Sequence, residues 1–291
     1  MTGESTAALL AMLRVAGYAG FVVWAGPLLF WTLVWPAGHR HRRLHRLSAV
    51  GAVVLILTSV TEPTIRLVAG GQSLAEVAPP LAGAAVLVRL AVLVASLFYL
   101  VDLANGAVVG SRRVIVLVAV VVVAATVAVQ PTVLGQAGPV LAAVGTAGQL
   151  FAAAAWLGGL VALATVVRPG TEFGETGGLV TRFSRMATLG LVLLVLASGL
   201  AVLAGARTGA DSADEREGPG LLIRLGLLAA LLVVAWYAQR ITTRLAFRRL
   251  FSPLGTTGAT RDRTMALVVG TELAIAFGAL SAAMLVVLTP G

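Results

Sequence analysis

The chain has 291 residues, of which 59% are hydrophobic and 11% are charged, and its mean hydropathy is +0.99. A soluble domain of this length could not bury so much apolar surface, so the composition excludes a soluble protein and predicts an integral membrane protein. The net charge of +9 would suggest nucleic acid as the partner of a soluble protein, but here the expected partner is the lipid bilayer and no nucleic acid is expected. Cysteine is absent, which excludes disulfides and thiolate metal sites.

Eight apolar stretches are long enough to cross a bilayer, which takes about 20 helical residues. Lipid offers no hydrogen-bond partners to the backbone, so each stretch is predicted to be a helix. The fourth is rich in β-branched residues, but its length and its apolar neighbours favour a helix over a strand. The first is expected to remain in the mature protein, because the residues before it include Glu4 and no basic residue. The expected spans are 6–35, 47–69, 84–105, 113–130, 140–167, 183–204, 221–241 and 264–288.

The arginines are distributed unequally between the connectors. All 21 basic residues are arginine, and 15 of them lie in the connectors after the first, third, fifth and seventh spans or at the span ends that flank these connectors. Because cytoplasmic connectors carry an excess of basic residues, both termini are predicted to be extracytoplasmic.

An internal repeat is the second organising feature of the sequence. Trp24-Ala25-Gly26 is matched by Trp156-Leu157-Gly158, and 44–59 is matched by 183–198, with Ser59 on Ser198. A third match places Arg89 on Arg224. The order of the matches predicts a duplicated four-helix unit, with repeats at 1–138 and 139–291. Four spans per repeat give both halves the same orientation, related by an axis along the membrane normal. The glycines that follow Trp24 and Trp156 are typical of close helix crossing, here at the repeat interface.

Ionisable residues inside the spans are candidate functional residues, because each costs about 2.5–3.5 kcal/mol at a helix centre. All except one lie in the predicted extracytoplasmic half, and the functional interpretation is a polar cavity that opens to the outside. The alternative is that the arginines extend to the interface while Glu62 neutralises one of them. The candidates are Arg14, Glu62, Arg66, Arg89, Arg224 and Glu272.

Specific pairings follow from the spacing. Glu62 and Arg66 are four residues apart and are expected to pair along one helix face. Arg89 and Arg224 are expected to face each other across the repeat axis, with Glu62 or a bound anion between them. Glu272 is a candidate for a proton or cation role, and pairing with an arginine or hydroxyl of a neighbouring helix is the alternative.

Metal ligands are scarce in the spans. His39, His41 and His45 fall in the first cytoplasmic connector among arginines, so a loop that faces lipid headgroups is favoured over a metal site. No histidine lies in a span, so no haem is expected. Met12 and Met284, both near the extracytoplasmic face, are weak candidates for copper(I) ligands.

The second half resembles the copper-resistance D (CopD) family of bacterial inner-membrane proteins. The resemblance covers about 145–290 and rests on AAAAWLGGLVAL from Ala152, on RFSRMATLGLVLLVLASGL from Arg182, and on two segments that begin at Leu221 and Gly270. It implies a multi-pass protein of the bacterial cytoplasmic membrane that takes up or delivers copper, often beside a periplasmic copper-binding protein. Where the family usually has a histidine ahead of WLGG this chain has Gln149, and where it has a lysine this chain has Arg224.

The sequence therefore predicts an all-α membrane protein that handles copper in transport, delivery or resistance. The alternative is a non-transporting scaffold or assembly factor for a copper-dependent or respiratory enzyme. An enzyme is not expected, because no nucleophile, base and orienting group recur together in the spans. A transporter requires a continuous polar path from Arg14, Glu62 and Gln149 to Glu272, whereas a scaffold can have a sealed interior. The candidate cavity residues are Arg14, Glu62, Arg66, Arg89, Gln149, Trp156, Arg224 and Glu272.

Overall fold

The computed structural model describes residues 3–36, 38, 41–70, 79–104, 112–129, 139–166 and 173–209. Within these ranges the chain is helical almost throughout and contains no strand, in agreement with the all-α prediction. The seventh and eighth predicted spans lie outside the described residues, so the total of eight stays a prediction.

The first six predicted spans all fall on helices, including the valine-rich fourth. Two of the six contain a wider, π-helical turn, at η1 and at η3. The elements are α1 (Gly3–Leu29), η1 (Phe30–Val34), α2 (Arg42–Gly70), α4 (Pro80–Ala104), α5 (Arg112–Ala128), α7 (Pro139–Ala153), η3 (Ala154–Gly158), α8 (Gly159–Val166) and α9 (Phe173–Gly209).

Five helical segments of the described part are long enough and apolar enough to cross a membrane. They are Ser5–Val34, Arg42–Val68, Pro80–Asp102, Pro139–Val166 and Arg182–Leu200, and the apolar stretch of α5, Arg113–Ala128, is shorter. Large apolar side chains cover the outside of the bundle as well as its interior. Leu57, Leu87 and Phe98 are 60%, 69% and 73% exposed, a surface suited to lipid rather than water.

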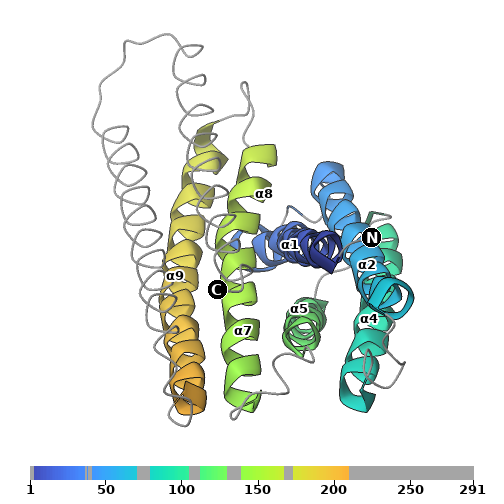
Figure 1. Ribbon diagram of the computed structural model, residues 1–291. Helices are drawn as coiled ribbons and strands as arrows, with labels where there is room; N and C mark the ends of the chain where they lie inside the picture. Colours follow the sequence, from blue (N-terminus) through green and yellow to red (C-terminus); the bar gives the residue numbers. More distant parts are fainter. Residues whose placement is uncertain are drawn as a thin grey trace.

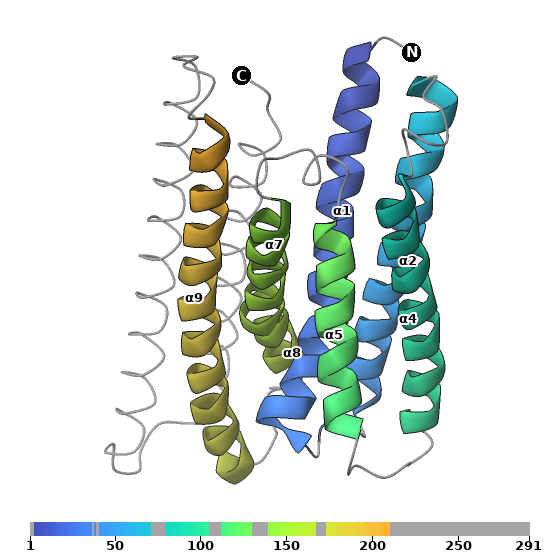
Figure 2. The ribbon, with the colours of Figure 1, turned by 90° about the horizontal axis from the view of Figure 1, so that it is seen from below.

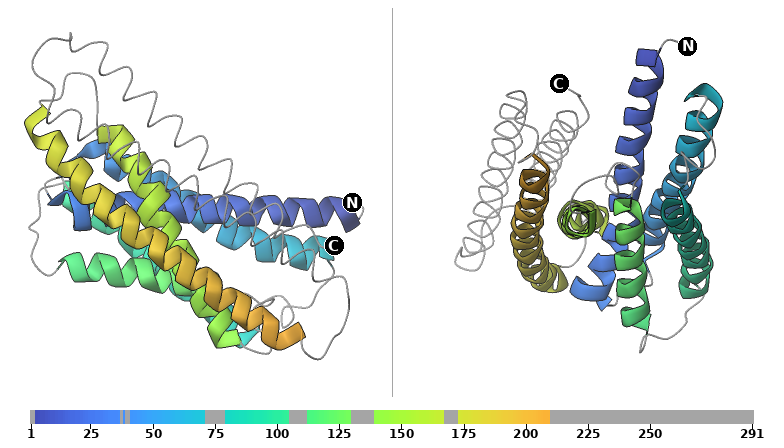
Figure 3. Two further views of the ribbon diagram at one scale, coloured as in Figure 1. Left: turned by 90° about the vertical axis from the view of Figure 1, so that its left-hand side faces the viewer. Right: turned by 60° about the horizontal axis from the view of Figure 1, so that its bottom comes forward.

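The helices form a closed ring of contacts. The helix α1 packs against α2, α2 against α4, α4 against α5, and α5 against α7, while η3 returns to α1. The outer helix α9 packs against α7 (Figure 1). In Figure 2, α1 and the α7–α8 segment both run downward and α2 and α9 both run upward. The right-hand view of Figure 3 looks along α7, which lies between α9 and α5. The first and fifth predicted spans therefore share one direction and touch each other.

Two glycines allow α1 and η3 to touch. A Cβ added to Gly26 would overlap the backbone of Gly158, and one added to Gly158 would lie 2.5 Å from both Gly26 Cα and the carbonyl oxygen of Val22. The close helix crossing predicted at these glycines is confirmed. Nearby, Trp24 is fully buried, and its indole Nε1 donates a hydrogen bond of 3.1 Å to Ser96 Oγ on α4.

The start of α9 differs from the sequence prediction. The sixth span was predicted to begin at residue 183, but the helix that contains it begins at Phe173. Leu179 and Phe183 are 8% and 6% exposed, so apolar positions one turn apart continue onto the core and extend the helix toward its N-terminus.

The π-helical turn η1 follows a proline in α1. Pro27 has no backbone N–H, so it cannot donate to the carbonyl four residues earlier, and the regular ladder is interrupted. The helix then widens, and the Trp35 N–H donates to the Phe30 carbonyl at 3.0 Å. Neither this turn nor η3 follows from hydrophobic periodicity.

Candidate polar site within the helix bundle

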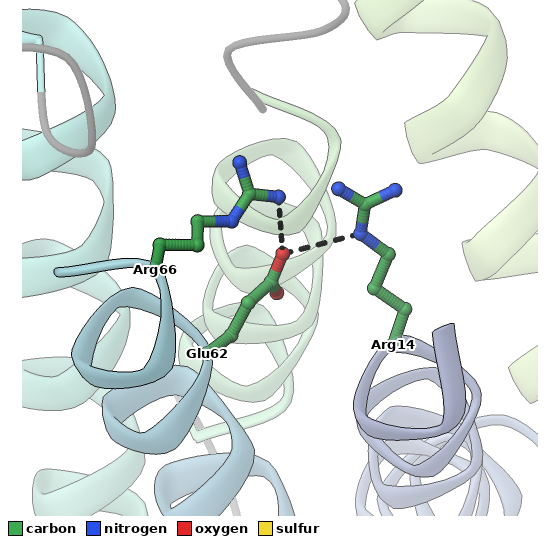
Figure 4. Close-up of polar contacts among 3 residues, drawn as sticks. All are labelled: Arg14, Glu62 and Arg66. Carbon is green, nitrogen blue, oxygen red and sulfur yellow. Dashed lines mark hydrogen bonds and ion pairs between the residues drawn. The ribbon is translucent and has the colours of Figure 1, made fainter. Parts of the chain in front are cut away.

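A carboxylate on α2 holds two arginines from different directions. Glu62 Oε1 accepts hydrogen bonds from Arg14 Nε of α1 at 3.1 Å and from Arg66 Nη2 of α2 at 2.8 Å (Figure 4). The predicted pairing of Glu62 with Arg66 is confirmed. The Arg14 pair is an additional link, and it ties the first two helices together.

Arg89 binds two neighbouring helices from α4. Its Nη1 donates to Ser59 Oγ on α2 at 3.2 Å, and its Nη2 donates to the carbonyl oxygen of Thr126 on α5. Thr126 lies in the last turn of α5, where carbonyls have no helical donor of their own, so Arg89 caps that helix. The remaining nitrogen atom of the guanidinium, Arg89 Nε, is buried and has no hydrogen-bond partner among the described residues. Whether Arg224 faces Arg89 stays a prediction, because Arg224 lies outside the described residues.

A proline lies directly beside the acidic residue. Pro63, inside α2, cannot donate to the carbonyl of Ser59 four residues earlier, so this turn has one helical hydrogen bond fewer. In lipid such a gap must be filled by nearby polar groups. The local sequence therefore favours a polar cluster at this depth.

The side chains of Arg14, Glu62 and Arg89 line a cavity of about 30 Å³. That volume holds a water molecule or two. Arg14, Glu62 and Arg89 all lie in its wall, and helices α1, α2, α4 and α5 all contribute residues. The polar part of the wall consists of Arg14, Tyr18, Thr58, Ser59, Glu62 and Arg89.

An apolar layer follows the cavity toward the other end of the bundle. Phe21, Trp24, Leu93 and Leu157 are each at most 1% exposed. Together with the backbone contact of Gly26 with Gly158, they fill the space between α1, α4 and η3.

Gln149 occupies a second polar position, between α7 and α9. Its Nε2 donates a hydrogen bond of 3.1 Å to Ser198 Oγ, and Ser198 is 5% exposed. Trp156, one of the candidate residues, lies two turns further along in η3 and is 7% exposed. The structure thus separates Gln149 from the cluster of Arg14, Glu62, Arg66 and Arg89.

His45 differs from the sequence prediction, whereas His39 lies outside the described residues. A headgroup-facing loop was expected at 39–45, but His45 lies in the first turn of α2 and is 7% exposed. Its ring packs edge-on against Trp31, with ring centroids 5.3 Å apart. The aromatic surface of η1 is what draws this residue into the core. Among the described residues no three histidine, cysteine, aspartate or glutamate side chains lie close enough to hold a metal ion.

The remaining candidates are either on the surface or outside the described residues. Met12 is 70% exposed and faces away from the cavity residues of α1. Glu272 and Met284 lie outside the described residues, as Arg224 does, so their predicted roles stay predictions.

Sequence reasoning did not single out two partners of Arg89. One is a backbone carbonyl, that of Thr126, and nothing in a sequence marks it. The other is Ser59, for which a signal existed: the repeat alignment places Ser59 on Ser198. In both halves this serine accepts a hydrogen bond from a polar side chain of another helix, Arg89 in one and Gln149 in the other.

The fold and the polar site define a multi-pass α-helical membrane protein. Comparison of the chain with protein-family models, with curated proteins and with solved structures finds no match.

Proposed function

We propose that the protein handles copper at the bacterial cytoplasmic membrane, as its resemblance to the CopD family implies. In this proposal eight spans form two parallel four-helix repeats with both termini outside. The protein receives copper at the extracytoplasmic face, with a periplasmic copper-binding protein as its partner, and passes it across or along the membrane. It has no catalytic role.

The observation that carries the proposal is the polar pair of Gln149 and Ser198. It lies in an otherwise apolar interface between two membrane helices, at the position where the family usually has a histidine. The WLG segment of the same resemblance forms the π-helical turn η3, and such turns occur frequently at functional sites. A polar residue and a widened helix therefore coincide where the family resemblance expects the cargo to bind.

The arginine cluster does not fit a copper ion. Arg14, Arg66 and Arg89 bring three positive charges to one carboxylate, and a cation placed there would be repelled. Guanidinium groups also have no lone pair to offer a metal. Copper would therefore be held near Gln149 rather than beside Glu62.

A second candidate function is a non-transporting scaffold or assembly factor for a copper-dependent or respiratory enzyme. The apolar layer of Phe21, Trp24, Leu93 and Leu157 favours it, because a transporter needs a polar path where these side chains lie.

Copper binding to the purified full chain in detergent tests the proposal, with copper(I) and copper(II) measured separately. Wild type is compared with Gln149→His, which restores the family's usual ligand, and with Thr146→His as a matched control one turn earlier on α7. Copper handling requires saturable binding by wild type that Gln149→His strengthens and Thr146→His does not. Binding only by Gln149→His would favour the scaffold, and no binding by any variant would overturn the copper proposal.

A further inference from the structure

We propose that the cavity between α1, α2, α4 and α5 binds a small inorganic anion of the size of chloride. The inference does not depend on copper handling, since it rests on the charge and the donors of a different set of residues.

The first argument is the charge of the cluster. Glu62 pairs with the guanidinium groups of Arg14 and Arg66, and a third guanidinium, that of Arg89, lines the same cavity as Glu62. This leaves an excess of two positive charges inside a membrane helix bundle. Buried charge is stable only when paired, and within the membrane this requirement is stricter than in water. Among the described residues, Glu62 is the only acidic side chain that forms an ion pair with these arginines. A bound anion supplies the missing negative charge.

The second argument is the supply of donors. Arg89 lines the cavity, and its buried Nε has no hydrogen-bond partner among the described residues. Both contacts that Arg14 and Arg66 make with Glu62 go to the same oxygen. Figure 4 shows the two guanidinium groups on either flank of that oxygen, with their other nitrogen atoms directed away from the carboxylate. An anion in the cavity, which Arg14 and Arg89 line, gains charge-assisted hydrogen bonds, which are stronger than neutral ones.

The third argument is size. The cavity volume of about 30 Å³ accommodates a monatomic ion or a water molecule or two. It excludes an organic anion such as gluconate. The Ser59 hydroxyl in the wall accepts a hydrogen bond from Arg89 and can turn its own hydrogen toward an anion.

The test is chloride-35 NMR line broadening with the purified full chain in an uncharged detergent. We expect saturable broadening that bromide reverses and gluconate does not. Arg89→Gln should weaken chloride binding at least about tenfold, whereas Arg113→Gln, an exposed arginine outside the cavity, should leave it unchanged. Glu62→Gln removes the competing negative charge and should tighten binding at least about tenfold.

The increase expected for Glu62→Gln keeps the test decisive even if Arg89→Gln does not fold, because misfolding cannot improve binding. Non-saturable broadening in the wild type, equal competition by gluconate, or weaker binding by folded Glu62→Gln would each overturn the proposal. Copper is absent from every arm, so failure here leaves the copper proposal standing.

Discussion

Gly26 of α1 and Gly158 of η3 meet backbone to backbone, so that neither position has room for a Cβ atom. These residues are 132 positions apart and follow the two tryptophans that the internal repeat matches. A symmetric duplication whose axis passes between the first and fifth spans would bring equivalent residues together in this way. The contact supports the proposed repeat and makes the crossing a point where small changes are costly.

Gly26→Ala and Gly158→Ala should each destabilise the protein by at least about 2 kcal/mol, because overpacking against backbone cannot be relieved by a side-chain rotation. Unfolding in mixed micelles, followed by tryptophan fluorescence, measures the free energy. Gly199→Ala is the matched control, since a Cβ there meets nothing within 4 Å, and it should be neutral or mildly stabilising. Equal effects at all three positions would refute the close crossing.

Gly51 and Gly190 are equivalent positions in the repeat, but the space around them differs in the structure. A Cβ at Gly51 would overlap the backbone nitrogen of Trp24 and lie 2.7 Å from the Gly20 carbonyl oxygen, whereas at Gly190 the nearest atom, the Ala152 carbonyl oxygen, is 3.5 Å away. Gly51→Ala should therefore cost about 1–3 kcal/mol, and Gly190→Ala should cost less than about 0.5 kcal/mol. The same unfolding assay compares them. A larger loss for Gly190→Ala would contradict the looser crossing of α7 with α9.

The two ion pairs of Glu62 should differ in their contribution to helix association. Arg66 and Glu62 lie on one helix, so their pair persists when the helices separate within the membrane, whereas the pair with Arg14 is lost. Double-mutant cycles with Glu62→Gln should give a coupling of about 1–3 kcal/mol with Arg14→Gln and of at most about 0.5 kcal/mol with Arg66→Gln. A larger coupling for Arg66 would mean that the pair within α2 also stabilises the bundle.

The helical architecture of the described part could be predicted from the sequence, because the apolar length of a span depends on the thickness of the bilayer. The pairing of Glu62 with Arg66 was predictable for a similar reason, since four residues bring two side chains to one helix face. The bond from Arg14 to Glu62 was not, because it depends on the register between α1 and α2. Arg89 was predicted to face Arg224 with Glu62 or a bound anion between them, and its contact with the Thr126 carbonyl depends on where α5 ends. The burial of His45 depends on the aromatic surface of η1, which periodicity does not reveal.

The orientation of the bundle decides which compartment the arginine cavity faces, and the absence of cysteine makes it directly measurable. Ser5, near the start of α1, and Arg43, near the start of α2, are both exposed. Because α1 and α2 run in opposite directions (Figure 2), the two residues lie near opposite ends of the bundle. We expect a membrane-impermeant maleimide to label Ser5→Cys in intact spheroplasts and Arg43→Cys only after permeabilisation, because arginine-rich connectors remain in the cytoplasm. The wild type, which has no cysteine, is the control for background labelling. The opposite pattern would turn the cavity toward the cytoplasm, and a periplasmic copper donor could then no longer reach the protein from the side proposed.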